Sequence, residues 1–175
     1  MTVAGGGRSA VIASIPLPAP LAAIREAGDA SAAVGVPPHV TILFPFLPAG
    51  SLSASVRSDL AAVAASAEPF TAGFSRVERR EGMVWLVPDD QAPFLALTAA
   101  VASRWPGHPP YGGIHERLIA HLTLLETDDG DALDRTVSIA REVLPFEVEV
   151  VELIVIAEDS DGRWSERWRL GLGAS

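Results

Sequence analysis

The sequence predicts an α+β fold that is bilobal and built from duplicated units, each with a mainly antiparallel sheet and two helices. Two observations predict it. The order strand, helix, strand, helix, strand occurs in both halves of the chain. Each half also contains a strand with a His-x-Thr motif, His39-Val40-Thr41 in the first and His121-Leu122-Thr123 in the second. In both halves a helix follows this strand, ends at a Pro-Phe pair (Pro69-Phe70 and Pro145-Phe146) and is followed by a further strand. A pseudo-two-fold axis and a central cleft are therefore expected.

The first half of the chain supplies five elements. An apolar run predicts a strand over residues 9–15, and a short helix is expected over 19–28. Residues 39–44 are rich in β-branched and aromatic types, which favours a second strand. Apolar residues then recur at helical spacing, which predicts a helix before the next strand begins at Pro69-Phe70 (Leu52, Val56, Leu60 and Val63).

The second half repeats this order. A strand is expected over 83–87, and Asp89-Asp90 are good caps for a helix that runs to about residue 104. A loop rich in proline and glycine leads to a strand over 118–125 that contains the second His-x-Thr motif. The next helix has one apolar face (Leu133, Val137, Ala140 and Leu144). Two final runs, 147–156 and 163–172, flank the turn 159–162 and predict a hairpin.

Composition sets the domain organisation and limits the partners. We expect a flexible tail over residues 1–8 and a single domain over 9–175, with lobes of roughly 9–80 and 81–175. Cysteine is absent, which excludes thiol nucleophiles, disulfide scaffolds and cysteine-based metal sites. The net charge of −9 argues against long duplex nucleic acid as a partner. The apolar runs are too short for a membrane span, and we expect a cytoplasmic monomer.

The two His-x-Thr motifs are the main candidates for chemistry. Because side chains alternate along a strand, His39 and Thr41 share a face, as do His121 and Thr123, roughly 6–7 Å apart. If the lobes face each other, two imidazoles and two hydroxyls converge on one cleft. One neutral imidazole could accept a proton while the other, as imidazolium, donates one, since both forms coexist near a pKa of roughly 6.5. We predict that both histidines are catalytic, that both threonines bind phosphate oxygens, and that no metal or other cofactor is needed.

The same residues also allow other interpretations. Each histidine alone could be a core residue bonded to a backbone carbonyl, and each threonine a simple strand former. Tyr111 could stack on a base or only pack its loop, Arg117 could reach a phosphate, and His115 is a weaker candidate for ligand contact. The tryptophans are expected to pack (Trp85, Trp105, Trp164 and Trp168), and three arginines to form a solvated strand edge (Arg76, Arg79 and Arg80).

The segments PPHVTILFPF (residues 37–46) and PPYGG…HLTLLE (109–113 and 121–126) resemble the 2H phosphoesterase superfamily, which includes 2′-5′ RNA ligase-like proteins and 2′,3′-cyclic nucleotide phosphodiesterases. This resemblance implies a duplicated bilobal fold, a catalytic pair at His39 and His121, and phosphate ligands at Thr41 and Thr123.

The chain departs from the usual pattern of this superfamily on both sides of the second motif. Typical RNA ligase-like members have an arginine after it, where this chain has Leu125 and Glu126, and many members have proline at the position of Ala120. An acidic group at the cleft would repel a polyanion. We therefore expect hydrolysis of a 2′,3′-cyclic phosphate or a 2′-5′ phosphodiester of a small nucleotide or RNA terminus, rather than RNA ligation. The alternatives are a non-catalytic module that binds nucleotide or phosphate, and an interaction domain with structural histidines.

Overall fold

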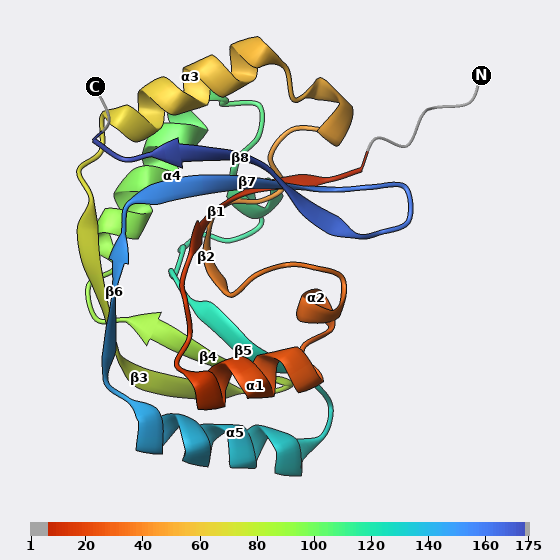
Figure 1. Cartoon of the computed structure of the whole chain (residues 1–175), viewed down its shortest axis with the longest axis vertical. Helices are drawn as coiled ribbons and strands as arrows, with labels where there is room; N and C mark the ends of the chain where they lie inside the picture. Colours follow the sequence, from red (N-terminus) through yellow and green to blue (C-terminus); the bar gives the residue numbers. More distant parts are fainter. Residues whose placement is uncertain (1–6, 174–175) are drawn as a thin grey trace.

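The computed structural model describes residues 7–173 and contains two four-stranded antiparallel sheets. The first sheet, in the order β2-β1-β7-β8, joins the two ends of the chain (Figure 1). Its strands are β1 (Ser9–Ser14), β2 (His39–Leu43), β7 (Glu152–Glu158) and β8 (Trp164–Gly171). The second sheet, in the order β5-β4-β3-β6, is built from the middle of the chain. Its strands are β3 (Phe70–Arg80), β4 (Met83–Pro88), β5 (Leu122–Glu126) and β6 (Phe146–Val150).

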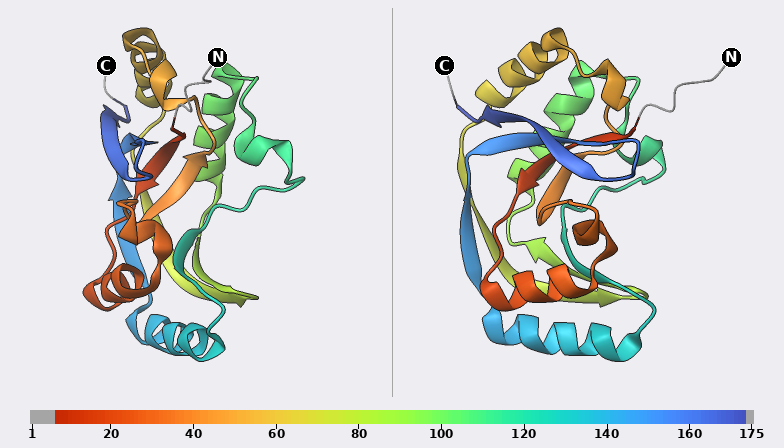
Figure 2. Two further views of the ribbon diagram at one scale, coloured as in Figure 1. Left: turned by 90° about the vertical axis from the view of Figure 1, so that its right-hand side faces the viewer. Right: turned by 45° about the vertical axis from the view of Figure 1, so that its right-hand side comes forward.

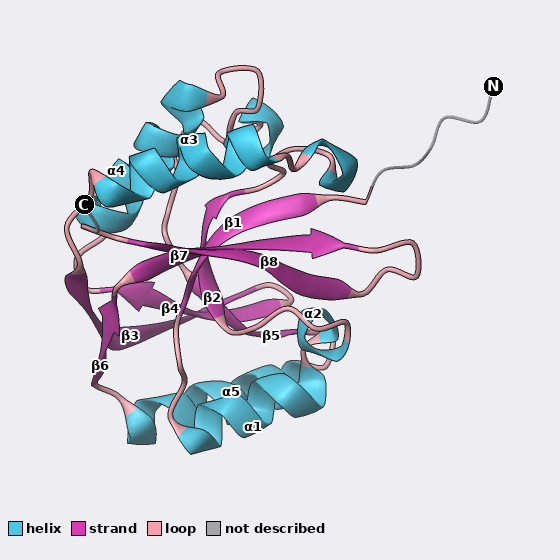
Figure 3. Cartoon of the chain, turned by 45° about the horizontal axis from the view of Figure 1, so that its top comes forward, coloured by secondary structure: helices cyan, strands magenta, loops and turns pink. Residues whose placement is uncertain are grey.

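The helices lie on the two outer sides of the molecule, with the strands between them (Figure 3). Helices α3 (Ala54–Ala65) and α4 (Ala92–Arg104) pack on β8 and β2 of the first sheet, whereas α1 (Ala19–Gly28) and α5 (Gly130–Val143) pack on the second. Figure 2 shows α1 and α5 side by side beneath that sheet. Three short elements are α2 (Ala30–Ala33) and the 3₁₀ turns η1 (Ala49–Ser51) and η2 (Pro110–Gly113).

Two of the helices cross from one sheet to the other. Helix α1 follows β1 of the first sheet but covers the second, and α4 follows β4 of the second sheet but covers the first. Each sheet therefore has two helices, as the duplicated α+β fold predicts, but one of each pair is exchanged between the sheets. This exchange makes it impossible to separate the lobes without unpacking both.

One continuous apolar cluster connects the two sheets. It contains Val11 and Ile42 from the first sheet and Phe74 and Leu86 from the second, all at most 1% exposed. The Phe74 ring also stacks on that of Phe146, with centroids 5.2 Å apart. Burial of each large apolar side chain contributes about 1.5–3 kcal/mol, so this shared cluster holds both sheets in one domain.

Most expected elements are confirmed, with three differences. The final hairpin is present as β7 and β8, but the run 147–156 is divided between β6 and β7 in different sheets. The division falls at Val151, which is 51% exposed where the chain crosses between the sheets. The sheets also do not follow the expected boundary near residue 80, because β3 pairs with β4 and the last hairpin returns to β1.

The third difference concerns the strand that carries the second motif. It begins at Leu122 rather than at residue 118. The backbone N–H of Ala120 donates to the Gln91 side chain at 3.1 Å instead of joining the strand ladder. The segment that precedes His121 is therefore irregular.

The N-terminal tail is described only in part, since residues 1–6 of it lie outside the described residues. Arg8 is not loose: its guanidinium donates two hydrogen bonds of 2.8 Å to the Glu158 carboxylate. Between residues 7 and 173, no helix is long and apolar enough to cross a membrane.

Candidate functional site

The first His-x-Thr motif lies on β2, and the second lies at the start of β5, with His121 immediately before the first strand residue, Leu122. Both strands are at the edge of their own sheets, and these two edges contact each other. Burial alternates along both strands. In the first motif Val40 and Ile42 are buried, and in the second Leu122 and Leu124 are buried. The histidine and threonine of each motif are partly exposed on the opposite face.

The backbone orients both imidazoles in the same way. Nδ1 of His39 lies 2.7 Å from the carbonyl oxygen of Pro37, and Nδ1 of His121 lies 2.8 Å from that of Ile119. A carbonyl oxygen only accepts, so each Nδ1 carries a proton and donates. In the neutral ring this leaves Nε2 free to accept a proton, which is the form that a general base requires.

The threonines have different contacts. Thr41 Oγ1 lies 3.1 Å from Nε2 of His39, and its hydroxyl donates to the neutral ring. Burial raises the pKa of the Tyr111 hydroxyl, and its hydrogen bond with Thr41 only partly opposes this rise. Thr123 Oγ1 has only a distant contact, 4.0 Å from Sδ of Met83. The first motif is therefore held more firmly than the second.

His39 lies in surroundings that favour its neutral form. Burial lowers the pKa of His39 to about 4, and the hydrogen bond to Pro37 only partly opposes this. The positive charge of Arg25 lowers the pKa further, as does a charge on His121. The two imidazoles are thus within electrostatic range of each other.

The pKa of His121 is also lowered. Burial lowers its pKa, the hydrogen bond to the Ile119 carbonyl opposes this, and the positive charges of Arg80 and His115 lower it further. With both pKa values depressed, both rings can act as bases in the free protein. A protonated ring needs an added negative charge beside it.

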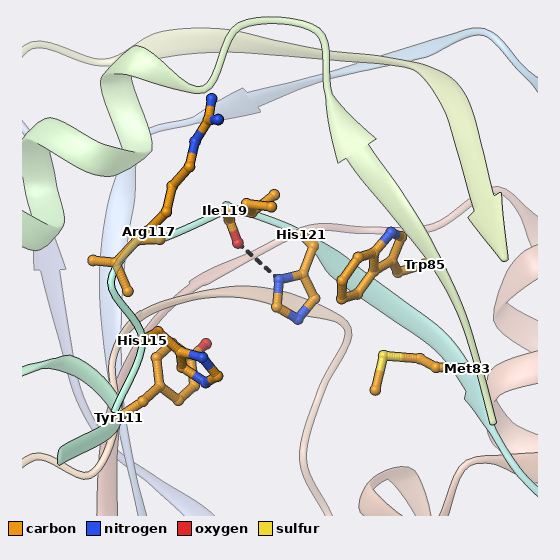
Figure 4. Close-up of a pocket in the computed structure, with 8 residues that line it drawn as sticks. Met83, Trp85, Tyr111, His115, Arg117, Ile119 and His121 are labelled. Atoms are coloured by element: carbon orange, nitrogen blue, oxygen red, sulfur yellow. Dashed lines mark hydrogen bonds between the residues drawn. The ribbon is translucent and has the colours of Figure 1, made fainter. Parts of the chain in front are cut away.

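A cavity of about 320 Å³ opens beside His121. Figure 4 shows Tyr111 and His115 on one side of the imidazole and Trp85 and Met83 on the other. The Tyr111 and His115 rings meet edge to face, with centroids 5.3 Å apart. The cavity therefore offers flat aromatic surfaces next to a candidate catalytic group.

A second cavity, of about 590 Å³, lies beside His39. Thr123 of the other motif lines it too, so side chains from both motifs face the same space. The remaining lining is polar or small (Arg25, Asp29, Ala30, Ser31 and Glu126). The cavity beside His121 is thus lined by aromatic rings, whereas the cavity beside His39 is polar and bears carboxylates.

A buried ion pair forms part of the wall of the cavity beside His39. Nε of Arg25 lies 3.3 Å from Oδ2 of Asp29, and both side chains are about 5% exposed or less. Arg25 also donates to the Val36 carbonyl and to the Ser31 hydroxyl, each at 2.9 Å. These hydrogen bonds connect α1 to the segment that leads into His39, and so they help to fix the position of His39.

The other candidates from the sequence lie as follows. Arg117 lines the cavity beside His121, although it lies before β5, which begins at Leu122. Tyr111 and His115 line the same cavity, and the Tyr111 N–H donates to the Phe44 carbonyl at the end of β2 at 2.6 Å. The loop that carries them is therefore attached to the first motif.

Trp85 was expected only to pack, and Met83 was not among the predicted site residues, yet both line the cavity beside His121. A signal for them exists in β4, where Met83 and Trp85 alternate with the buried Val84 and Leu86. No such signal marks Arg25 or Asp29, which reach the site only because α1 packs across the second sheet.

The arrangement can perform proton transfer at an anion. Each imidazole has its Nδ1 bonded to a backbone carbonyl, so in the neutral ring Nε2 is the atom that can accept a proton, and a threonine hydroxyl lies on the same strand face. Over residues 7–173, His, Cys, Asp and Glu side chains form no group of three or more that could hold a metal ion.

Solved structures share this fold at low sequence identity. Escherichia coli LigT complexed with 3′-AMP is 20% identical with a TM-score of 0.57, over 95% of this chain and 98% of LigT. TT0787 of Thermus thermophilus is 18% identical with a TM-score of 0.60, over 96% of this chain and 99% of that one.

A third structure, described as a phosphoesterase, is 20% identical with a TM-score of 0.54, over 95% and 98% of the two chains. No curated protein matches the sequence. The family model of the 2′-5′ RNA ligase superfamily matches residues 14–162, most of the chain, and the protein therefore belongs to that superfamily.

Proposed function

We propose that this protein is a metal-independent phosphoesterase in which His39 and His121 act as the acid–base pair. The proposed substrate is a 2′,3′-cyclic phosphate or a 2′-5′ phosphodiester of a small nucleotide or RNA terminus. The observation that carries the proposal is the meeting of two His-x-Thr motifs on contacting edge strands, with Thr123 of one motif and His39 of the other in one cavity. Membership of the 2′-5′ RNA ligase superfamily supports it.

The proposed reaction is an in-line displacement at phosphorus. Nε2 of one imidazole accepts a proton from water as the water oxygen forms a bond to phosphorus. Nε2–H of the other imidazole donates its proton to the ester oxygen as the bond from phosphorus to that oxygen breaks. The two rings end with their protonation states exchanged, and proton exchange with solvent restores them.

The substrate itself helps to create the acid. Burial and neighbouring positive charges lower the pKa of His39 to about 4 and also lower that of His121. A phosphodiester carries one negative charge, which favours the imidazolium form of a nearby ring and raises its pKa. Binding of the anion is therefore expected to bring one proton into the site.

Thr41 and Thr123 are proposed to bind the non-bridging phosphate oxygens, since their hydroxyls share the faces of the two imidazoles. Tyr111 is proposed to stack on a base in the aromatic cavity, where Arg117 could reach a phosphate. The comparison structure of LigT holds 3′-AMP, which is a nucleotide of this size.

A small substrate suits the charge of the chain. The net charge is −9, and Asp29 and Glu126 line the cavity beside His39. A long polyanion would meet these carboxylates, whereas a mononucleotide with a single phosphate could keep its charge between the imidazoles. This favours hydrolysis of a small ester over ligation of RNA.

The test is turnover of adenosine 2′,3′-cyclic phosphate and of a 2′-5′ diadenosine by purified protein in excess EDTA. His39→Ala and His121→Ala should each lower kcat/KM by about 10²–10⁴, the usual contribution of a general acid or base. His108→Ala is the matched control, because His108 lines neither cavity.

The outcomes separate the enzyme from a binding module. Turnover that survives both histidine substitutions, or that disappears with EDTA, contradicts the proposal. Tight binding of adenosine 3′-phosphate by a protein that hydrolyses none of these substrates would identify the binding module instead.

A further inference from the structure

The His121 imidazole has less hydrogen-bond support than that of His39. His39 has two restraints, the Pro37 carbonyl at Nδ1 and the Thr41 hydroxyl at Nε2. His121 has only the Ile119 carbonyl at Nδ1, and no side chain or backbone group between residues 7 and 173 hydrogen-bonds to its Nε2. One hydrogen bond leaves the plane of the ring free to tilt, because the χ2 torsion of histidine is soft.

An aromatic contact supplies the missing restraint. The Trp85 indole lies against the His121 ring, with centroids 4.5 Å apart and an angle of 43° between the planes (Figure 4). Trp85 pairs with Thr123 in the β4–β5 ladder, and Thr123 is two residues after His121. The indole and the imidazole therefore stand on the same face. A flat ring at this distance limits rotation of the imidazole about χ2.

The indole is itself held in place by β3. Nε1–H of Trp85 donates to Oε2 of Glu78 at 3.1 Å, and these two residues face each other in the β3–β4 ladder. The Arg80 guanidinium packs over the indole, with Cζ 4.9 Å from the ring centroid, and its Nη2 lies 3.7 Å from the same Glu78 oxygen. Glu78, Arg80 and Trp85 thus contact one another, and Trp85 in turn contacts His121.

We infer that Glu78, Arg80 and Trp85 form a bracket that sets the orientation of the His121 imidazole for proton transfer. The inference rests on the proposed acid–base function. Trp85 is a positioning residue in this scheme: it does not exchange a proton, but it holds Nε2 of His121 on the line to the reacting oxygen. Misplacement of a reacting group by about 1 Å can lower a rate about 100-fold, so a restraint on ring tilt has a measurable effect.

The kinetic test compares two substitutions that differ in ring planarity. Trp85→Leu keeps an apolar side chain but removes the flat ring, and it should lower kcat about 10- to 100-fold with KM changed less than about threefold. Trp85→Phe keeps a flat ring and should retain kcat within about threefold. An equal rise of KM in both variants, with kcat unchanged, would show that Trp85 is only a cavity wall and would overturn the inference.

The matched control is Trp164→Leu. Trp164 also lies beneath an arginine, with Cζ of Arg8 5.6 Å from its ring, and beside an aromatic ring, that of Phe44 at 6.3 Å. It lines neither cavity of the site. Its loss should leave kcat within about twofold of the wild-type value.

A second readout needs no turnover. The Nδ1–H proton of His121, bonded to the Ile119 carbonyl, should exchange slowly with solvent in the wild type and in Trp85→Phe, and at least about tenfold faster in Trp85→Leu, as measured by NMR. Unchanged exchange in Trp85→Leu would overturn the bracket even if the wild type proved inactive. Absence of wild-type turnover would overturn the proposed function alone.

If Trp85→Leu does not fold, Glu78→Ala tests the same bracket more gently, because the Glu78 side chain is 41% exposed. The hydrogen bond between the indole N–H and Glu78 is then lost, as it is in Trp85→Phe, but here the Arg80 guanidinium that covers the ring also loses its carboxylate partner. This variant should show faster Nδ1–H exchange at His121 and a kcat lowered about threefold or more, and wild-type values for both would overturn the inference.

Discussion

Acidification from pH 7 to pH 5 should destabilise the folded chain through His39. Burial, with smaller effects from Arg25 and His121, lowers the pKa of its imidazole to about 4 in the folded protein. An unfolded histidine titrates near pKa 6.5, about 2.5 units higher. Between these values the unfolded chain binds a proton that the folded chain does not, so stability is full above pH 6.5 and is lost as the pH falls toward 4.

The magnitude follows from the width of this window. Each pH unit inside it costs about 1.4 kcal/mol, so the 1.5 units between pH 6.5 and pH 5 cost at most about 2 kcal/mol. For a domain with about 5–15 kcal/mol of total stability, this is a large change. It corresponds to a shift of about 1 M in the urea midpoint, because m-values for small proteins are about 1–3 kcal/mol/M.

The assay is urea denaturation of the wild type and of His39→Asn at pH 7, 6 and 5. Asparagine can still donate to the Pro37 carbonyl but does not titrate, so the variant keeps the local hydrogen bond and loses the proton linkage. The difference in unfolding free energy between the two proteins should change with pH in favour of the variant, by up to about 2 kcal/mol from pH 7 to pH 5. A difference that stays constant across this range would refute the assignment of the acid sensitivity to His39.

Three further results are expected. Sulfate, a divalent anion that does not titrate here, should bind with uptake of a proton by His39 or His121, and it should therefore bind more weakly as the pH rises. Calorimetry in two buffers of different ionisation enthalpy measures the proton uptake, and binding without proton uptake would contradict the shared anion site. Phe74→Ala should lower the free energy of unfolding by about 3–5 kcal/mol in urea melts, because the ring is fully buried. Ser53→Ala should lower the free energy of unfolding by about 1 kcal/mol in the same assay, because the Ser53 hydroxyl accepts a hydrogen bond from the Val56 N–H at the start of α3. Equal stability of the variant and the wild type would show that this cap does not stabilise the protein.

Much of the fold was predictable because local periodicity reports burial. Helices α1, α3, α4 and α5 and most strands lie within a few residues of their expected places, and the repeated order of elements indicated two similar units. Periodicity says which face of an element is buried but not which partner covers it. The exchange of α1 and α4 between the sheets was invisible for this reason, as was the division of the run 147–156 at Val151.

The same limit applies to the site. The His-x-Thr motifs gave the two imidazoles and two hydroxyls, because residues two apart on a strand share a face. Trp85 was assigned to packing, since an apolar strand with buried residues on one face does not reveal what the other face meets. Arg25 lies on α1, which the local pattern gave no reason to place beside His39. Arg25 lowers the pKa of His39 and Trp85 contacts the His121 ring, so the sequence indicated the candidate histidines but not the neighbours that surround them.

The position of the candidate site on two edge strands ties its geometry to the global fold. The distance between the imidazoles depends on how the edges of β2 and β5 meet, and that contact is held by a core shared between the sheets and by two helices exchanged across it. No single loop sets this distance. The side chains that line the cavity beside His121 are different, because Tyr111, His115 and Arg117 come from the partly irregular segment between α4 and β5. Under the proposed function, substitutions in this segment would alter the choice of substrate while the shared core keeps the two imidazoles in place, so specificity and proton transfer would depend on different parts of one domain.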